Sequence, residues 1–355
     1  MKGLILSGGK GTRLRPLTHT SAKQLVPVAN KPVLFYGIEA MAEAGIEEVG
    51  IIIAPETGGE IREAAGDGSQ FGIRIEYIEQ DAPLGLAHAV LTAEPFLGDA
   101  PFVMYLGDNL LRNGIVALVD TFRNERPDAL ILLTPVPDPE HYGVAELDGE
   151  GRVARLVEKP TEPKTDLALV GVYMFTPSIF DAARSIEPSW RDELEITDAI
   201  QTLVDRGLRV DPHIVHGWWK DTGQVQDMLE ANRLILDDLN ERIDGELVQS
   251  RVEGRVVIEA GARLERTTVR GPAVIGAGSR LVDAYIGPYT ALGDHVTIER
   301  AELEHSIVMS GSRISHVDHR IEASLIGKDV TIERGPPLPK AYRFVVGDSA
   351  DVQIL

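Results

Sequence analysis

The last third of the chain repeats an aliphatic residue at intervals near six. Between Val256 and Ile332 this residue is often followed by Gly or Glu, and long helices are hard to place. A six-residue period with small residues between the aliphatic positions is typical of a β-helix, in which each short strand turns a corner and stacks on the preceding coil. The repeated pairs are Ile258-Glu259, Leu264-Glu265, Ile275-Gly276, Ile286-Gly287, Leu292-Gly293, Ile298-Glu299, Ile326-Gly327 and Ile332-Glu333.

The repeat has two interruptions and one competing interpretation. The period slips at residues 281–286 and again between Glu299 and Ile321, so we expect an irregular coil or a loop at these places. The alternative is an ordinary antiparallel sheet with Gly-rich turns. The regularity of the repeat favours the β-helix.

Residues 1–240 show a different pattern, in which short apolar, β-branched runs alternate with segments of helical period. This order is typical of the α/β class, with a mostly parallel, Rossmann-like sheet flanked by helices. We therefore predict an α/β domain over 1–240 and a β-helix domain with a C-terminal strand tail over 241–355. Predicted strands are 3–6, 49–54, 74–78, 101–106, 129–134, 153–157 and 169–175, and predicted helices are 33–44, 85–93, 196–207 and 228–239.

Composition excludes several classes of function. The 35 basic and 55 acidic residues give a net charge of −20, which argues against binding to nucleic acid or to an anionic membrane surface. The absence of cysteine excludes a disulfide framework, a thiolate metal site and a cysteine nucleophile. The apolar N-terminal run is too short for a signal peptide, and no later run reaches the roughly 20 residues of a membrane span. We expect a soluble, cytoplasmic protein.

The sequence SGGKGTRLRP follows the first predicted strand. It places a Gly-rich turn at the carboxyl end of that strand, where open parallel sheets bind ligands. Glycines let backbone N–H groups approach phosphate oxygens, and Arg13 adds a planar, charged donor group. Neither the Rossmann fingerprint nor the P-loop spacing is present. Such a turn is often purely structural, but the two further basic residues of the turn, Lys10 and Arg15, together with Lys23 favour a polyphosphate site.

Seven further motifs accompany this turn. They are AKQLVPVANKP at 22–32, QDAPLGLAHAV at 80–90, YLGDN at 105–109, YGVAELD at 142–148, EKP at 158–160, ELEITD at 193–198 and WWKDTG at 218–223. In this order and without large gaps over residues 1–240, they resemble the sugar-phosphate nucleotidylyltransferase family, and its thymidylyl branch in particular. The repeat domain resembles the left-handed β-helix of long-form members of that branch.

The resemblance implies transfer of the dTMP group of dTTP to glucose 1-phosphate, giving dTDP-glucose and pyrophosphate. A phosphate oxygen would attack the α-phosphorus in line, a reaction that needs mainly positioning and charge neutralisation. Arg13 and Lys23 would stabilise charge on the departing pyrophosphate. Gln80 and Gly85 would contact the thymine. The implied nucleotide-binding residues are Gly8, Gly9, Gly11, Thr12, Gln80, Gly85 and Asp108.

The resemblance also implies one Mg²⁺, held by Asp108 and Asp221. Magnesium is usually bound by one or two carboxylates together with substrate phosphates and water. Lys159 would be the third catalytic residue, which binds the sugar phosphate and orients its attacking oxygen, and Glu158 would accept sugar hydroxyls. The implied sugar-phosphate-binding residues are Asn109, Gly143, Glu158, Lys159 and Gly171.

Without the family, these residues have plainer interpretations. Asp108 could be a turn residue at a strand end, Glu158 and Lys159 a surface ion pair, and Gln80 a buried amide that satisfies loop backbone. Glu195 could be a sugar-site carboxylate or part of a helix N-terminus with Thr197 as its cap. Trp218 and Trp219 could stack on a sugar, but packing beside Asp221 is the simpler interpretation.

Other functions remain open from the sequence. One is the same transfer with UTP or another nucleotide, because a single methyl group discriminates by only about 1–3 kcal/mol. A second is a bifunctional enzyme with an acyltransferase β-helix, although histidines at coil corners usually face solvent; the candidates are His295, His305, His316 and His319. A non-catalytic homologue is disfavoured because Arg13, Lys23, Asp108 and Asp221 are all present. We expect a homo-oligomer assembled through the β-helix, to which the segment 341–355 could add a strand.

Overall fold

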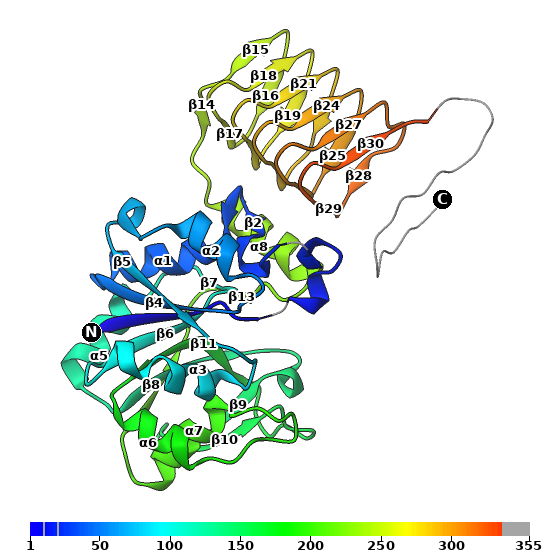
Figure 1. Ribbon diagram of the computed structural model, residues 1–355. Coiled ribbons are helices and arrows are strands. Elements are labelled where there is room, and N and C mark those ends of the chain that lie inside the picture. Colours follow the sequence, from blue (N-terminus) through cyan, green and yellow to red (C-terminus); the bar gives the residue numbers. More distant parts are fainter. Residues whose placement is uncertain (10, 20, 336–355) are drawn as a thin grey trace. The chain divides into compact units, whose positions relative to one another are not determined.

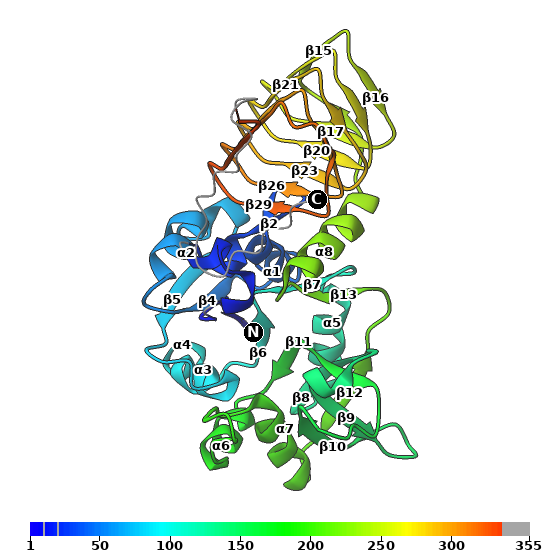
Figure 2. The same cartoon turned by 90° about the vertical axis from the view of Figure 1, so that its right-hand side faces the viewer.

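The computed structural model describes residues 1–9, 11–19 and 21–335 (Figures 1 and 2). The chain forms two compact units. Among the described residues, the first comprises 1–9, 21–25 and 33–221, and the second comprises 11–19, 26–32 and 222–335. The strand predicted within 341–355 lies outside the described residues. Within the described ranges, no helix is long and apolar enough to cross a membrane.

The first unit is built on a nine-stranded mixed sheet. Its main order is β10-β9-β11-β6-β1-β4-β5, and β8 joins β11 and β12. The strands β6, β1, β4 and β5 run parallel, as predicted. Strand β11 pairs antiparallel with β6, β8 and β9, so the sheet beyond β6 is mixed. The bounds are β1 Lys2–Leu6, β4 Glu48–Ile53, β5 Arg74–Glu79, β6 Phe102–Leu106, β8 Ala129–Pro135, β9 Gly143–Leu147, β10 Val153–Glu158, β11 Leu167–Phe175 and β12 Val210–Ile214.

Helices pack against both faces of this sheet. Leu4 and Leu6 point into a core shared with α3, α6 and α7, whereas Ile5 points into a core shared with α1, α2 and α5. Side chains alternate along a strand, so a buried run such as GLIL supplies both cores. The helices of the unit are α1 Val33–Glu43, α2 Gly58–Ala65, α3 Leu86–Thr92, α4 Glu94–Leu97, α5 Val116–Glu125, α6 Ser178–Ser185 and α7 Ile196–Asp205.

Short elements complete this unit. A two-stranded antiparallel ribbon pairs β7 (Asn109–Leu111) with β13 (Trp219–Asp221). It joins the segment after β6 to the WWKDTG motif, more than a hundred residues later in the chain. The 3-10 turns here are η3 Lys23–Leu25, η4 Ser69–Phe71 and η5 Pro139–His141.

The second unit contains the β-helix, which has three parallel sheets. Leu264 pairs with Leu281, which in turn pairs with Ile298, so aliphatic residues stack along the inside of the coils. This parallel pairing confirms the β-helix, consistent with the left-handed form, and excludes the antiparallel alternative. The strands are β14 Arg242–Ile243, β15 Glu246–Val248, β16 Arg251–Glu253, β17 Val256–Ile258, β18 Arg263–Glu265, β19 Thr268–Arg270, β20 Ala273–Ile275, β21 Arg280–Val282, β22 Tyr285–Ile286, β23 Thr290–Leu292, β24 Thr297–Glu299, β25 Glu302–Glu304, β26 Ile307–Val308, β27 Arg313–Ser315, β28 Ile321–Glu322, β29 Leu325–Ile326 and β30 Thr331–Glu333.

The predicted interruption at residues 281–286 is wrong. Strands β21 and β22 keep the register of the coils before and after them. The repeating unit of the structure is the whole coil, because residues stacked on each other, such as Glu246 and Arg263, are 17 residues apart in the sequence. Later partners are separated by 16 or 18 residues, so the slip between Glu299 and Ile321 is absorbed in the turns.

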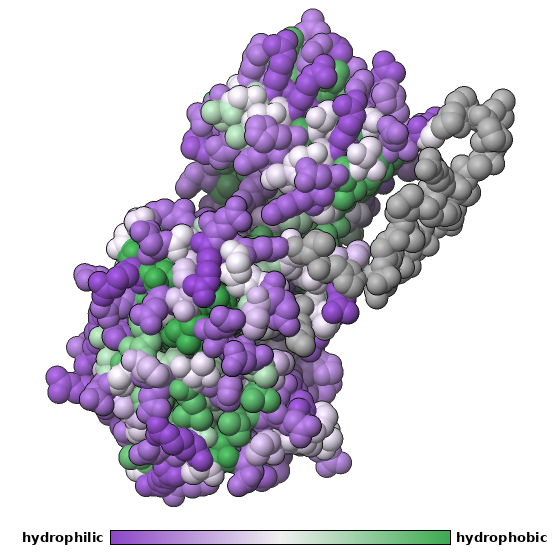
Figure 3. Space-filling view, viewed as in Figure 1, coloured by the Kyte–Doolittle hydropathy of each residue, from purple (hydrophilic) through white to green (hydrophobic). Residues whose placement is uncertain are grey.

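Left-handed backbone recurs at the coil corners. One column of corners has positive φ at Arg266, Asp283, Arg300 and His316. Positive φ is uncommon for residues other than glycine, so the stacked geometry of the coils imposes it. His295, His316 and His319 are exposed, as expected for corner histidines, whereas His305 is partly buried against Tyr289, with ring centroids 6.2 Å apart. Hydrophilic residues cover most of the β-helix on the face shown in Figure 3.

Part of the N-terminal sequence belongs to the second unit. The hairpin of β2 (Pro27–Val28) and β3 (Lys31–Pro32) contacts α8 (Val225–Asp237), where the buried Asn232 accepts a hydrogen bond from Ala29 N at 2.9 Å. Asn30 Nδ2 donates to the carbonyl of Leu292 at 2.6 Å, in the β-helix itself. The turns η1 (Thr12–Leu14) and η2 (Leu17–His19) also lie in this unit, and Leu17 packs against Gly327. The β-helix is therefore packed against the segment that follows the Gly-rich turn.

Candidate active site

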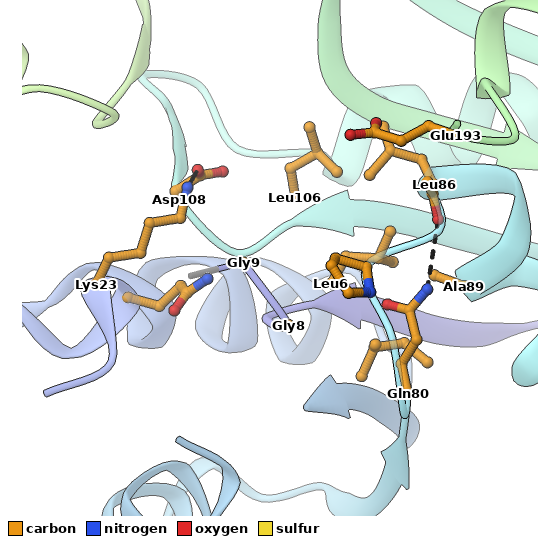
Figure 4. A pocket seen from close by; sticks show the side chains of 14 residues that line it. Leu6, Gly8, Gly9, Lys23, Gln80, Leu86, Ala89, Leu106, Asp108 and Glu193 are labelled. Carbon is orange, nitrogen blue, oxygen red and sulfur yellow. Dashed lines mark hydrogen bonds and ion pairs between the residues drawn. The ribbon is translucent and has the colours of Figure 1, made fainter. Parts of the chain in front are cut away.

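A pocket of about 230 Å³ opens in the first unit at the carboxyl ends of β1 and β6 (Figure 4). Ligand sites in open α/β sheets commonly occupy this edge, because backbone groups and loops converge there. Six of the predicted site residues line it: Gly8, Gly9, Lys23, Gln80, Gly85 and Asp108. The other lining residues are Leu6, Gln24, Ile52, Pro83, Leu86, Ala89, Leu106 and Glu193.

Lys23 and Asp108 form an ion pair at one end of this pocket. A Cβ on Gly9 would lie 3.3 Å from Lys23 Cε, so glycine there leaves room for the lysine side chain. Burial alone would raise the pKa of Asp108, but the Lys23 ammonium and a hydrogen bond from Asn109 outweigh it and hold the pKa below its ordinary value. Asp108 is therefore a carboxylate at neutral pH, and Lys23 places a positive charge beside the Gly-rich turn.

Asn109 connects Asp108 to two other segments. Its Nδ2 donates to Asp108 Oδ1 at 3.0 Å, and its Oδ1 accepts hydrogen bonds from Gly171 N at 3.2 Å and from Trp219 Nε1 at 2.5 Å. Only 2% of Asn109 is exposed. A Cβ on Gly171 would lie 2.6 Å from Asn109 Oδ1, so this contact requires glycine.

Asp221 lies next to Asn109, because the two residues are register partners between strands β13 and β7. The pairing brings the two predicted metal ligands, Asp108 and Asp221, to neighbouring positions. Two carboxylates suit Mg²⁺, which takes its remaining ligands from phosphates and water. The described part of the chain contains no cluster of three or more His, Asp or Glu side chains arranged for a metal. The donor set therefore fits a cation that is shared with a phosphate substrate.

A second group of predicted residues meets around Glu158. Thr197 Oγ1 donates to Glu158 Oε2 at 2.7 Å, and Lys159 Nζ lies 3.8 Å from Glu158 Oε1. A Cβ on Gly143 would lie 2.8 Å from Thr197 Oγ1, so glycine permits the close packing here. Lys159 itself has positive φ, and its N–H donates to the carbonyl of Tyr142 at 3.0 Å.

Arg191 forms ion pairs with the acidic side chains around Glu158. It donates to both oxygens of Glu195 at 2.8 Å and contacts Glu158 at 3.4 Å and Glu193 at 3.1 Å. Burial, together with the charges of Glu195 and Glu158, raises the pKa of Asp198. The region therefore carries more negative than positive charge around one guanidinium.

Three residues predicted to lie at the nucleotide phosphates do not line the pocket. Gly11, Thr12 and Arg13 belong to the second unit, where Thr12 and Arg13 begin η1 and are exposed. Gly11 has φ of 61°, in the left-handed region that favours glycine. Their roles in phosphate binding stay predictions.

The prediction from sequence missed several residues of this region. Gln24 lines the pocket, Glu193 lines it from the ELEITD motif, and Arg191 holds three carboxylates. Gln24 and Glu193 stood inside the quoted motifs, and Arg191 lies two residues before one. Trp219 donates its N–H to Asn109 and meets Tyr142 edge to face at 5.6 Å, a structural contact beside Asp221.

A pocket at the edge of an α/β sheet, with a Gly-rich turn, a lysine and two neighbouring aspartates, is typical of a nucleotide-binding enzyme of the phosphoryl-transfer class. The family model of nucleotidyl transferases matches residues 2–238. The chain therefore belongs to the nucleotidyl transferase family. Members generally use a divalent metal ion, and the family implies a nucleotide and a sugar phosphate as substrates.

Two relatives are similar over the whole chain, and a solved structure is similar over part of it. A glucose-1-phosphate thymidylyltransferase from Streptomyces antibioticus is 58% identical over 100% of this chain and 99% of its own. The enzyme of the same name from Streptomyces griseus is 54% identical, with the same coverage. A Bacillus anthracis protein solved in complex with a sucrose has a TM-score of 0.63 and 35% identity, over 66% of this chain and 94% of its own.

Proposed function

We propose that this protein is a glucose-1-phosphate thymidylyltransferase, which forms dTDP-glucose and pyrophosphate from dTTP and glucose 1-phosphate. The observation that carries this proposal is the 58% identity to an enzyme of that name over the entire chain, the β-helix included. The pocket supports it, because Lys23 and the Gly8-Gly9 turn converge where a triphosphate would need positive charge and backbone donors.

The chemistry assigned to the chain is positioning and charge neutralisation. Lys23 would stabilise the charge that develops on the leaving pyrophosphate, and Arg13 would join it from the Gly-rich segment. Lys159 would bind the phosphate of the sugar and direct its oxygen in line with the α-phosphorus. Glu158, held by Thr197 and Arg191, would accept hydrogen bonds from the hexose hydroxyls. Gly143 and Gly171 would leave room for the sugar beside Asn109.

We propose Mg²⁺ as the metal, held by Asp108 and Asp221. When bound, the ion neutralises phosphate charge and helps to align the triphosphate. Asn109 would keep the Asp108 carboxylate in place through its 3.0 Å hydrogen bond. Lys23 would exchange part of its contact with Asp108 for the phosphates.

The test is pyrophosphate release by the full chain with glucose 1-phosphate, Mg²⁺ and each of dTTP, UTP, ATP, CTP and GTP. We expect release with dTTP above the others, loss of release in the Asp108→Asn variant, and wild-type rates in Gly149→Ala, whose added methyl has nothing within 4 Å. A preference for UTP would transfer the assignment to a uridylyl enzyme. Absence of release with every nucleotide would overturn the proposal.

We also propose a cytoplasmic homo-oligomer, assembled through the β-helix. The regular coils present flat faces that a second copy could cover. Sedimentation of the full chain at several concentrations would measure its mass, and a monomer at every concentration would contradict this assembly.

A further inference from the structure

Gln80 lines the pocket at the point where β5 ends. Its backbone N–H donates to Ile53 O at 2.9 Å, so the residue continues the sheet pairing of β5 with β4. Its side-chain Nε2 lies 2.8 Å from Nδ1 of His88 and 3.5 Å from the carbonyl oxygen of Gly85 (Figure 4 marks the Gly85 contact). Both partners belong to the start of α3, on the other side of the QDAPLG loop.

The hydrogen-bond partners of the Gln80 amide indicate which of its atoms is left to face a ligand. A glutamine amide has two N–H donors on nitrogen and accepts only through oxygen. The Gly85 carbonyl can only accept, so Nε2 must face it, and the second N–H is then directed at His88 Nδ1. Both donors are used within the protein. The amide oxygen faces Gly8, since a Cβ on that glycine would lie 3.5 Å from Gln80 Oε1.

We propose that His88 is a positioning residue that holds the Gln80 amide with its oxygen toward the base, and so selects pyrimidines that carry an N3–H. This inference rests on the proposed function, in which Gln80 contacts the base. Thymine and uracil donate an N3–H to an acceptor. Cytosine has a lone pair at N3, which would face the lone pairs of Oε1. In this arrangement Nδ1 of His88 accepts the hydrogen bond from Gln80 Nε2.

The Gly85 carbonyl alone holds the amide weakly. Its distance of 3.5 Å is at the limit of a hydrogen bond, whereas the contact with His88 is 2.8 Å. Without an acceptor at position 88, the amide can turn over and offer its NH₂ group to cytosine N3. His88 is well placed to prevent this, because its neighbours Ala87, Ala89 and Val90 are buried and fix α3 against the core.

Two variants of the full chain separate positioning from packing. His88→Leu removes the acceptor but keeps an apolar side chain of moderate size. His88→Asn restores an acceptor, since Asn Oδ1 stands close to where His Nδ1 does. For each protein, kcat and KM are measured with dTTP, dCTP and dUTP, using glucose 1-phosphate and Mg²⁺. Deoxyuridine triphosphate is the matched control, because it differs from dTTP only in the methyl group and keeps the N3–H.

We expect His88→Leu to lower the preference for dTTP over dCTP by roughly 3- to 10-fold, the effect of one neutral hydrogen bond. The change should come mainly from KM, the dTTP to dUTP ratio should stay constant, and His88→Asn should recover most of the preference. An unchanged dTTP to dCTP ratio in His88→Leu overturns the inference. A parallel change in the dUTP ratio also overturns it, because it indicates a loosened pocket.

Failure of the proposed function gives a different result. In that case the wild-type protein shows no turnover with dTTP. The same three proteins are then compared by equilibrium binding of dTTP and dCTP. A binding preference that is weakened in His88→Leu and recovered in His88→Asn supports the inference, and equal preferences in all three refute it.

Discussion

Replacement of Asn109 by leucine tests whether this buried amide connects three segments of the site. Leucine has nearly the same shape but no polar atoms. Gly171 N–H and Trp219 Nε1–H, which now donate to Asn109 Oδ1 at 3.2 and 2.5 Å, would lose their acceptor. A buried donor left without a partner costs roughly 1–3 kcal/mol, so the two together predict a loss of about 2–6 kcal/mol in the free energy of unfolding.

A second substitution isolates one of these costs. Trp219→Phe removes the indole N–H, so in the Asn109→Leu background only the Gly171 N–H is left without an acceptor. The double variant should therefore be more stable than the sum of the two single effects predicts, by about 1–3 kcal/mol.

Urea unfolding of the four proteins, followed by tryptophan fluorescence and circular dichroism, measures this coupling. Additive effects within about 0.5 kcal/mol would refute the role given to the Trp219 hydrogen bond. Activity gives an independent readout, since Asn109→Leu also removes the donor to Asp108 Oδ1. We expect kcat to fall in Asn109→Leu more than in Trp219→Phe.

Three further outcomes are expected. Gly143→Ala should raise KM for glucose 1-phosphate, because the new methyl would lie 2.8 Å from Thr197 Oγ1, whereas Gly149→Ala meets nothing within 4 Å and should leave KM unchanged. Asp198→Asn should raise the melting temperature at neutral pH. Burial and the charge of Glu195 raise the pKa of Asp198 in the folded protein. The contribution of this carboxyl group to folding stability is therefore present in acid and is lost as pH rises through the folded pKa. That gain should therefore vanish in acidic buffer, and a constant gain at all pH values would contradict the assignment. Chelation of divalent ions should abolish pyrophosphate release, and excess Mg²⁺ should restore it; full activity in chelator would refute the metal site.

The sequence predicted those parts of the fold that have a local signal. The β-branched runs before Gly8 and Gly107 became β1 and β6, whose buried side chains alternate between two cores. The six-residue period predicted the β-helix. The interruption predicted at 281–286 was wrong, because the structural repeat is the whole coil and not the six-residue step.

Contacts between distant segments could not be predicted in the same way. Nothing local to Asn109 indicates that it pairs with Asp221, more than a hundred residues later, or that Trp219 donates to it. The partnership of Gln80 and His88 depends on how the QDAPLG loop folds back on α3. The EKP motif indicated Glu158 and Lys159, which lie together in the structure and whose sugar-binding role stays a prediction. Arg191 was missed because a lone arginine in a polar loop has no distinguishing pattern.

The membership of the N-terminal segments in the second unit has a consequence for the order in which the chain can fold during synthesis. Asn30 finds its partner carbonyl at Leu292, 262 residues later, and Leu17 packs against Gly327. The ribosome must therefore make most of the β-helix before the segment that carries Arg13 can reach its final contacts. Chain growth is slow, at about 5–20 residues per second, so synthesis of the intervening 262 residues takes roughly 13–50 s, during which the sheet of the first unit can already form. Completion of the coils thus controls when the segment that carries Arg13 reaches its contacts within the second unit.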